Sequence, residues 1–242
     1  LLPLECLYIE GSNEHEEKMT IQKNAYIVMD TETSGFSKLV FDFGWTTIDK
    51  RGNVLGKADM VFFDVAVTER PYFINKVKGY ARRMDKGIHR VTSFAVGRRL
   101  LNMHIAHLKA AGYRVILCAY NAGFDCRALN ITTKRMKLGN KFLTQSVELL
   151  DIWGNWAISA PKAYTAPPTA SGKFYSTSAE NVYKFEMQMP EFVEAHTAFE
   201  DTKIEAQILL KILNRKKRVK VVKNPRDFDH HIWKNFVIEG VA

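Results

Sequence analysis

Two carboxylates lie two positions apart in the segment Asp30-Thr31-Glu32. On an extended backbone, residues i and i+2 point to the same side, so Asp30 and Glu32 can bind one cation together. Hard divalent ions such as Mg2+ take carboxylate oxygens as ligands and keep several waters, which a substrate phosphate can displace. The pair alone is a weak signal, because two solvated carboxylates or a helix cap would give the same pattern.

Two further carboxylates follow at recognisable positions. Asp125 ends the segment Asn121-Ala122-Gly123-Phe124-Asp125, and Asp201 comes five residues after His196 in a His-x-Ala-x-x-Asp pattern. The histidine stands at the entrance of a predicted helix and Asp201 within its first turns. The two side chains can therefore face one cavity.

The three segments, in this order, resemble the three motifs of the DEDDh 3′-to-5′ exonuclease superfamily. This superfamily includes polymerase proofreading exonucleases, RNase T and oligoribonuclease, and its fold is ribonuclease H-like. All five motif residues are present, and the resemblance extends over about residues 26–213. The motif residues are Asp30, Glu32, Asp125, His196 and Asp201.

The resemblance implies catalysis by two divalent cations, Mg2+ with Mn2+ expected to substitute. It assigns Asp30, Glu32 and Asp201 to one ion, and Asp30 with Asp125 to the other. Two ions about 3.5–4 Å apart can hold an attacking water and stabilise the charge that develops on the phosphate and on the departing 3′ oxygen. The resemblance makes His196 the general base, a role that suits an unperturbed pKa of about 6.5.

Candidate substrate contacts also come from the resemblance. Thr33, Gly35 and Phe36 occupy positions where members of the superfamily contact the terminal nucleotide. An aromatic ring can stack on any base, so Phe36 could hold a terminal base without selecting it; ordinary core packing explains this residue equally well. Asn121 could orient substrate or cap the helix that follows it.

Three other carboxylates, Asp42, Asp151 and Glu205, are rivals because they belong to elements that lead to the same site. Glu205 lies one helical turn after Asp201 on nearly the same face. We choose Asp201 as the ligand because its distance from His196 matches the spacing in the superfamily.

The elements that must position these residues alternate between strands and helices. Residues 25–29 form a short apolar run typical of a buried strand, and it ends at Asp30. Residues 39–48 and 54–64 predict two strands joined by a turn, which completes an antiparallel meander. The next predicted elements are a basic helical stretch at 71–91, a helix whose apolar stripe extends from Leu100 to Leu108 and which stops near Gly112, and a strand at 113–119. A helix from about Cys126, a strand at 146–152, a loop at 159–178 and a helix after His196, with its apolar face between Ala198 and Ile212, follow. This order predicts an α/β fold with a mixed sheet flanked by helices.

Composition agrees with a partner that is a polyanion. The formal net charge is +9 and the isoelectric point is about 9.4. Three cysteines without a Cys-x-x-Cys spacing argue against a disulfide framework and against a thiolate zinc site. No apolar run approaches the roughly 18 residues of a membrane span, so we expect a soluble cytoplasmic protein with no membrane partner.

We expect residues 1–22 to be a leader or a cloning remnant, 23–214 to be the exonuclease domain, and 215–242 to be a basic extension packed on that domain. The basic run at 215–218 could track phosphates or form a solvated helix end. The predicted activity is release of nucleoside 5′-monophosphates from 3′ ends, with single-stranded DNA favoured over RNA and with a polymerase or other replication or repair partner. The alternatives are hydrolysis of short RNA and a non-catalytic nucleic-acid-binding module.

Overall fold

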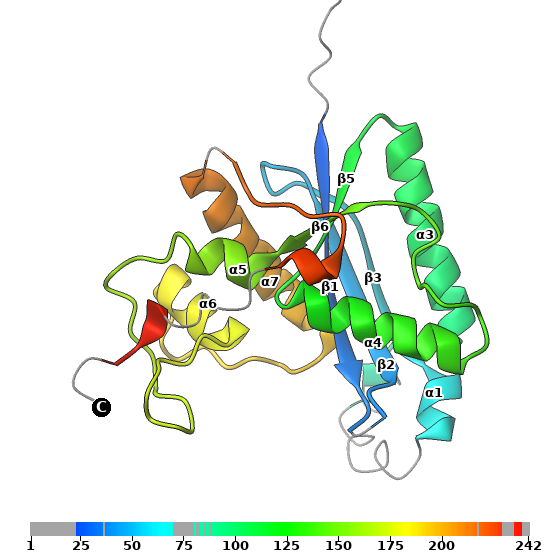
Figure 1. The fold of residues 1–242 in the computed structure, drawn as a ribbon. Coiled ribbons are helices and arrows are strands. Elements are labelled where there is room, and N and C mark those ends of the chain that lie inside the picture. Colours follow the sequence, from blue (N-terminus) through cyan, green and yellow to red (C-terminus); the bar gives the residue numbers. More distant parts are fainter. Residues whose placement is uncertain are drawn as a thin grey trace, which may run out of the picture.

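A six-stranded mixed sheet forms the centre of the molecule in the computed structural model, which describes residues 23–35, 37–69, 80, 83–84, 86–87, 89–216, 218–228 and 235–238. The strand order is β4-β3-β2-β1-β5-β6 (Figure 1). The strands are β1 Asn24–Thr33, β2 Val40–Ile48, β3 Val54–Phe62, β4 Arg90–Thr92, β5 Arg114–Ala119 and β6 Glu148–Asp151. β1, β2 and β3 are antiparallel, whereas β4, β5 and β6 each pair in parallel with a neighbour. The predicted meander and mixed sheet are confirmed.

Helices cover both faces of this sheet (Figure 1). One face carries α1 Phe63–Thr68, α3 Phe94–Ala110 and α4 Ala122–Arg135; the other carries α5 Ile152–Ala157, α6 Ala179–Met187 and α7 Ala198–Arg215. A short 3-10 helix, Pro225–Asp227, follows. None of the helices in the described ranges is long and apolar enough to cross a membrane.

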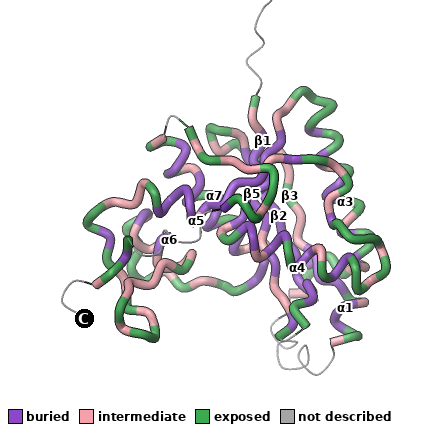
Figure 2. The backbone as a smooth tube through the Cα atoms, in the orientation of Figure 1, coloured by how far each residue is buried: buried purple, intermediate pink, exposed green. Residues whose placement is uncertain are grey.

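The central strand β1 is buried on both sides because its alternate residues enter different clusters. Ile27 and Met29 pack with α3 and α4, whereas Tyr26 and Val28 pack with α5 and α7. Figure 2 shows the resulting buried centre, with exposed residues on the outer surfaces of the helices, in the loops and in the outer strands β3 and β4. Because β1 lies at the centre of the sheet, the carboxylates at its end are held by a rigid element.

Several predicted boundaries were wrong. The strand predicted at 54–64 ends at Phe62, and α1 begins directly after it. The strand predicted at 146–152 is shorter, and α5 begins at Ile152. The helix predicted from Cys126 begins at Ala122, so Asp125 belongs to the first turn of α4 rather than to the strand end.

The predicted loop and the predicted terminal segments can be compared with the structure only in part. Residues 159–178 contain no described helix or strand, as predicted, although an isolated bridge joins Pro168 to Tyr175. Most of the helical stretch predicted at 71–91, and all of residues 1–22, lie outside the described residues, but the end of that stretch was predicted wrongly, because Arg90 and Val91 belong to β4. In the predicted C-terminal extension, Val222 pairs with Leu149 of β6.

Candidate active site

The end of β1 presents functional groups on both faces of the sheet. Asp30 and Glu32 share the face that carries α7, whereas Thr31 points to the opposite face. The Thr31 hydroxyl donates a hydrogen bond of 2.7 Å to Oδ1 of Asp125. The first motif is therefore joined directly to the second by a side chain that we did not select from the sequence.

Asp125 is placed by the capped start of α4. Asp151, at the end of β6, accepts hydrogen bonds from the backbone nitrogens of Ala122 at 2.9 Å and Gly154 at 2.8 Å, so it anchors α4 and α5 together. Asn121 accepts a longer bond of 3.3 Å from the Phe124 nitrogen. These contacts satisfy free N–H groups of two helix starts and give Asp151 a structural role.

Asp201 is placed by the close approach of α7 to β2. A Cβ added to Gly44 would lie 2.5 Å from backbone atoms of Phe199, so the start of α7 rests against the bare backbone of the strand. Asp42 accepts bonds from the Ala198 nitrogen at 3.1 Å and from the Tyr80 hydroxyl at 2.8 Å, both at Oδ2. This carboxylate therefore anchors the helix that carries Asp201.

Burial and the charges of neighbouring carboxylates raise the pKa values of Asp30, Asp125 and Asp201. Burial, followed by the charges of Asp125 and Asp201, raises the pKa of Asp30 well above its ordinary range. Burial also raises the pKa of Asp125 to about 7, although the Thr31 hydrogen bond opposes this shift. The pKa of Asp201 rises to about 8 because of burial and then the charges of Glu194 and Glu32.

This concentration of carboxylates fits a hard divalent cation. Asp201 is 6% exposed, and its buried Oδ1 has no hydrogen-bond partner among the described residues. A buried carboxylate oxygen without a donor is costly, and a bound cation would supply the missing interaction. Asp30, Glu32, Asp125 and Asp201 are therefore a chemically suitable donor set.

His196 lies at the edge of this acidic group. Its backbone has φ of 52°, and its side chain is 68% exposed. Nδ1 lies 3.6 Å from Oε2 of Glu194. Within the described ranges, Glu180, Glu194 and His196 form a group whose potential metal-ligand atoms all lie within 4.8 Å of one another. The carboxylates of Asp30, Glu32, Asp125 and Asp201 are not all this close to one another.

The predicted substrate contacts have different positions. Thr33 is half-buried at the end of β1, and Gly35 is exposed in the turn that follows. Phe36 lies outside the described residues. Asn121 was predicted either to orient substrate or to cap the following helix. In the structure it caps α4, because its side chain accepts the bond from the Phe124 nitrogen.

Glu180 and Glu194 were not selected from the sequence, because neither stands at a motif spacing.

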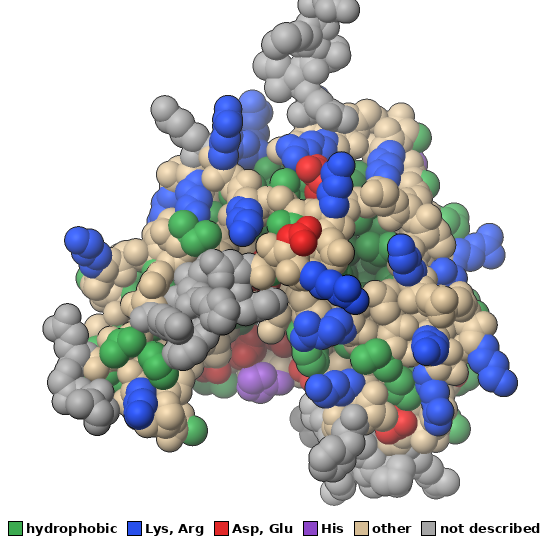
Figure 3. Space-filling view, in the orientation of Figure 1, with side chains coloured by type: hydrophobic (Ala, Val, Ile, Leu, Met, Phe, Trp, Pro, Cys, Tyr) green, Lys and Arg blue, Asp and Glu red, His purple; other side chains and the backbone are tan. Residues whose placement is uncertain are grey.

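Figure 3 shows acidic side chains gathered beside a histidine in a recess of the surface, with Lys and Arg side chains spread over the neighbouring face that α4 occupies. The exposed basic residues of α4 and the turn after it are Arg127, Lys134, Arg135 and Lys137.

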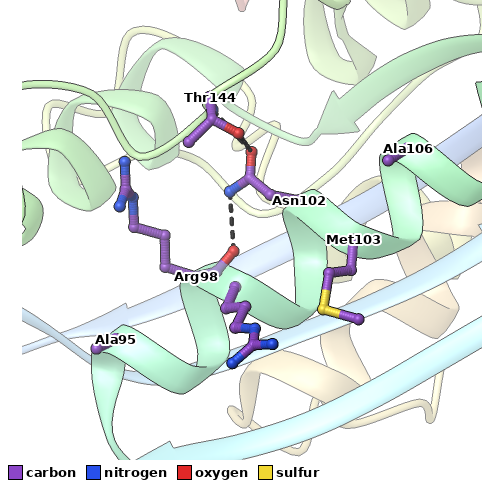
Figure 4. Close-up of a pocket in the computed structure, with 7 residues that line it drawn as sticks. Ala95, Arg98, Asn102, Met103, Ala106 and Thr144 are labelled. Carbon is purple, nitrogen blue, oxygen red and sulfur yellow. Dashed lines mark hydrogen bonds between the residues drawn. The ribbon is translucent and has the colours of Figure 1, made fainter.

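A separate pocket of about 340 Å³ lies against the outer side of α3 (Figure 4). Three of its polar side chains are already engaged: Asn102 accepts bonds from the Thr144 nitrogen and hydroxyl at 2.7 and 2.8 Å, and Arg98 donates to the Phe142 carbonyl at 2.9 Å. These bonds fix the chain segment before β6. The pocket contains none of the predicted catalytic residues.

No family model and no curated protein matches the chain. Among solved structures, a 3′-exonuclease bound to a histone mRNA stem-loop is similar with a TM-score of 0.53 and 11% identity, over 83% of this chain and 86% of the other. A full-length 3′-exonuclease has a TM-score of 0.52 and 12% identity, over 90% of each chain. Exonuclease X in complex with 5′-overhanging duplex DNA has a TM-score of 0.44 and 15% identity, over 80% of this chain and 94% of the other. The fold is thus ribonuclease H-like, and these structural neighbours are exonucleases.

Proposed function

We propose that this chain is a metal-dependent 3′-to-5′ exonuclease of the DEDDh type that releases nucleoside 5′-monophosphates. The supporting observation is that the fold brings the three motifs, which are widely separated in sequence, close enough to interact by hydrogen bonding and by charge. Thr31 bonds to Asp125 at 2.7 Å, and the charges of Asp125 and Asp201 both act on Asp30. The shared fold with solved 3′-exonucleases is consistent with this function but does not assign it.

The proposed mechanism gives each residue a separate task. Asp30, Glu32 and Asp201 would hold one divalent ion, and Asp30 with Asp125 would hold the second. When bound, the ions supply Lewis-acid stabilisation of the charge that develops on the phosphate and the departing 3′ oxygen. The Thr31 hydroxyl fixes the orientation of the Asp125 carboxylate.

His196 would accept the proton of the water that attacks the phosphorus, while the bond from phosphorus to the 3′ oxygen breaks and that oxygen takes a proton from solvent. The carboxylate of Glu194, 3.6 Å from Nδ1 of His196, would stabilise the imidazolium. Because the His196 side chain is largely exposed, it can reach the water only from the rim of the site. We therefore assign it to proton transfer and not to metal binding.

The proposed substrate is a nucleic-acid 3′ end, with single-stranded DNA favoured. The net charge of +9 and the basic side chains of α4 beside the acidic recess favour a polyanion (Figure 3). RNA is the second candidate, because one structural neighbour is a 3′-exonuclease that recognises an mRNA stem-loop. The structural neighbours give no support to a polymerase partner.

The deciding experiment uses 5′-labelled single-stranded DNA and RNA of one sequence, with Mg2+ or with EDTA. With Mg2+ we expect labelled strands shortened stepwise from the 3′ end, together with unlabelled nucleoside 5′-monophosphates detected by chromatography, and in EDTA we expect neither. Circular strands and strands with 3′-terminal phosphorothioates should resist, and Asp30→Asn combined with Asp201→Asn should be inactive. Glu200→Gln is the matched control, because Glu200 pairs with Lys203 at 2.8 Å. Hydrolysis in EDTA, or rapid nicking of circles, would refute the proposal.

A further inference from the structure

Glu205 is a buried carboxylate that the proposed mechanism does not use. It lies on α7 one turn after Asp201, so the two side chains share one face of the helix. Glu205 is only 2% exposed, and its Oε2 is buried without a hydrogen-bond partner among the described residues. A carboxylate in such a position is costly unless a donor or a cation compensates for lost hydration.

The surroundings of Glu205 are acidic. Burial raises the pKa of Glu205 well above its ordinary range, and the charges of Asp30, Asp125 and Asp201 raise it further, in that order. Those three groups are proposed metal ligands. Glu205 therefore lies in the neighbourhood of these carboxylates, on the face of α7 that it shares with Asp201.

The other two rival carboxylates have structural explanations that Glu205 lacks. Asp151 accepts the backbone nitrogens of Ala122 and Gly154, and Asp42 accepts the Ala198 nitrogen and the Tyr80 hydroxyl. Each of them anchors the start of a helix. Glu205 lies in the middle of α7, where no helix terminus needs an acceptor.

A second observation independently indicates a ligand at this place. Oδ1 of Asp201, one turn earlier, is also buried without a hydrogen-bond partner in the described part of the chain. Two adjacent carboxylates on one helix face thus each present an unsatisfied oxygen. A divalent cation would compensate both, whereas two neutral donors would each have to come from a residue or water.

We propose that Glu205 is a fifth carboxylate of the cation centre, bound to the ion of Asp30 and Asp201 directly or through one water. This inference rests on the proposed function. Five carboxylates carry one more negative charge than two divalent ions neutralise, so the loaded centre would keep a net negative charge unless one proton remained. Glu205 stands nine residues after His196, outside the motif spacing, which is why the sequence pattern excluded it.

The test measures cation binding without turnover, by calorimetric titration of Mn2+ and Mg2+ into the full chain. Glu205→Gln keeps the shape of the side chain and removes its charge, and we expect cation affinity to fall at least about 10-fold, as changes around a metal site commonly cause. Glu205→Asp, which retracts the carboxylate, should also weaken binding. Both variants are first checked for a cooperative unfolding transition.

Glu200→Gln is the matched control, because this carboxylate lies on the same helix but pairs with Lys203 at 2.8 Å. It should bind cations as the wild type does. Affinity of Glu205→Gln within two-fold of the wild type would overturn this inference, provided that Asp30→Asn loses binding in the same titration. If the wild type binds no divalent cation, the proposed function itself fails.

Discussion

Asp201→Asn is expected to stabilise the metal-free protein at pH 8, although it should abolish activity. The wild-type side chain is buried, its Oδ1 has no hydrogen-bond partner among the described residues, and nearby carboxylates repel its charge. Asparagine has nearly the same shape and no charge. The substitution should therefore remove a repulsion that only a bound cation would otherwise relieve.

The direction and size of the effect follow from the pKa. The pKa of Asp201 rises from 3.8 to about 8 on folding, so the folded chain holds this proton more tightly than the unfolded chain does. The stabilising contribution is complete below about pH 4 and is lost as the pH rises to about 8. One pKa unit is worth about 1.4 kcal/mol, so the whole shift corresponds to ~6 kcal/mol. Loss of a favourable charge in the first turn of α7 subtracts up to ~1 kcal/mol.

Urea unfolding in EDTA at pH 4 and pH 8 measures this difference. We expect Asp201→Asn to exceed the wild type by ~2 kcal/mol or more at pH 8 and to match it near pH 4. Glu200→Gln, which removes a neighbouring charge paired with Lys203, controls for the helix-dipole contribution. Adding Mg2+ at pH 8 should stabilise the wild type but not the variant. A variant less stable than the wild type at pH 8 in EDTA would show that a favourable contact holds Asp201.

Three further predictions concern other contacts of the site. Thr31→Val removes the bond that opposes the raised pKa of Asp125, so the acidic limb of the pH–rate profile should move to higher pH, while Thr31→Ser should keep the wild-type profile. Gly44→Ala places a Cβ 2.5 Å from the Phe199 backbone, and urea unfolding should show a loss of ~1–3 kcal/mol. His196→Ala should lower turnover by about 10² to 10⁴-fold at neutral pH, with partial recovery at high pH and unchanged Mg2+ affinity by calorimetry.

The parts of the fold that local patterns determine could be predicted from the sequence. Residues 25–29 and 113–119 are continuous apolar runs, and such runs predict strands buried on both faces. The helical periodicity of 198–212 predicted α7 with nearly its observed limits. These elements also carry Asp30 and Asp201, but the selection of these two residues as ligands came from the resemblance and not from periodicity.

The remaining features depend on contacts between distant segments. β4 has three residues and exists through its pairing with β3, which no local pattern encodes. The start of α4 lies four residues before its predicted position, where the local cap Asn121 accepts from the Phe124 nitrogen and Asp151, 29 residues away, accepts from the Ala122 nitrogen. The contact between Thr31 and Asp125 was equally hidden, since a threonine between two carboxylates carries no signal of which group it will meet.

The hydrogen bonds divide the buried carboxylates of this site into two groups, those that cap a helix and those that do not, and sequence spacing does not reveal this division. Asp42 and Asp151 each accept bonds from a helix start, and this use explains their burial even though Oδ1 of Asp42 has no hydrogen-bond partner in the described ranges. Asp201 and Glu205 have no such use, yet they lie side by side on α7 against the end of β1. Because folding alone would favour apolar residues at these two positions, the proposed cation is what would compensate their oxygens that lack a hydrogen-bond partner among the described residues.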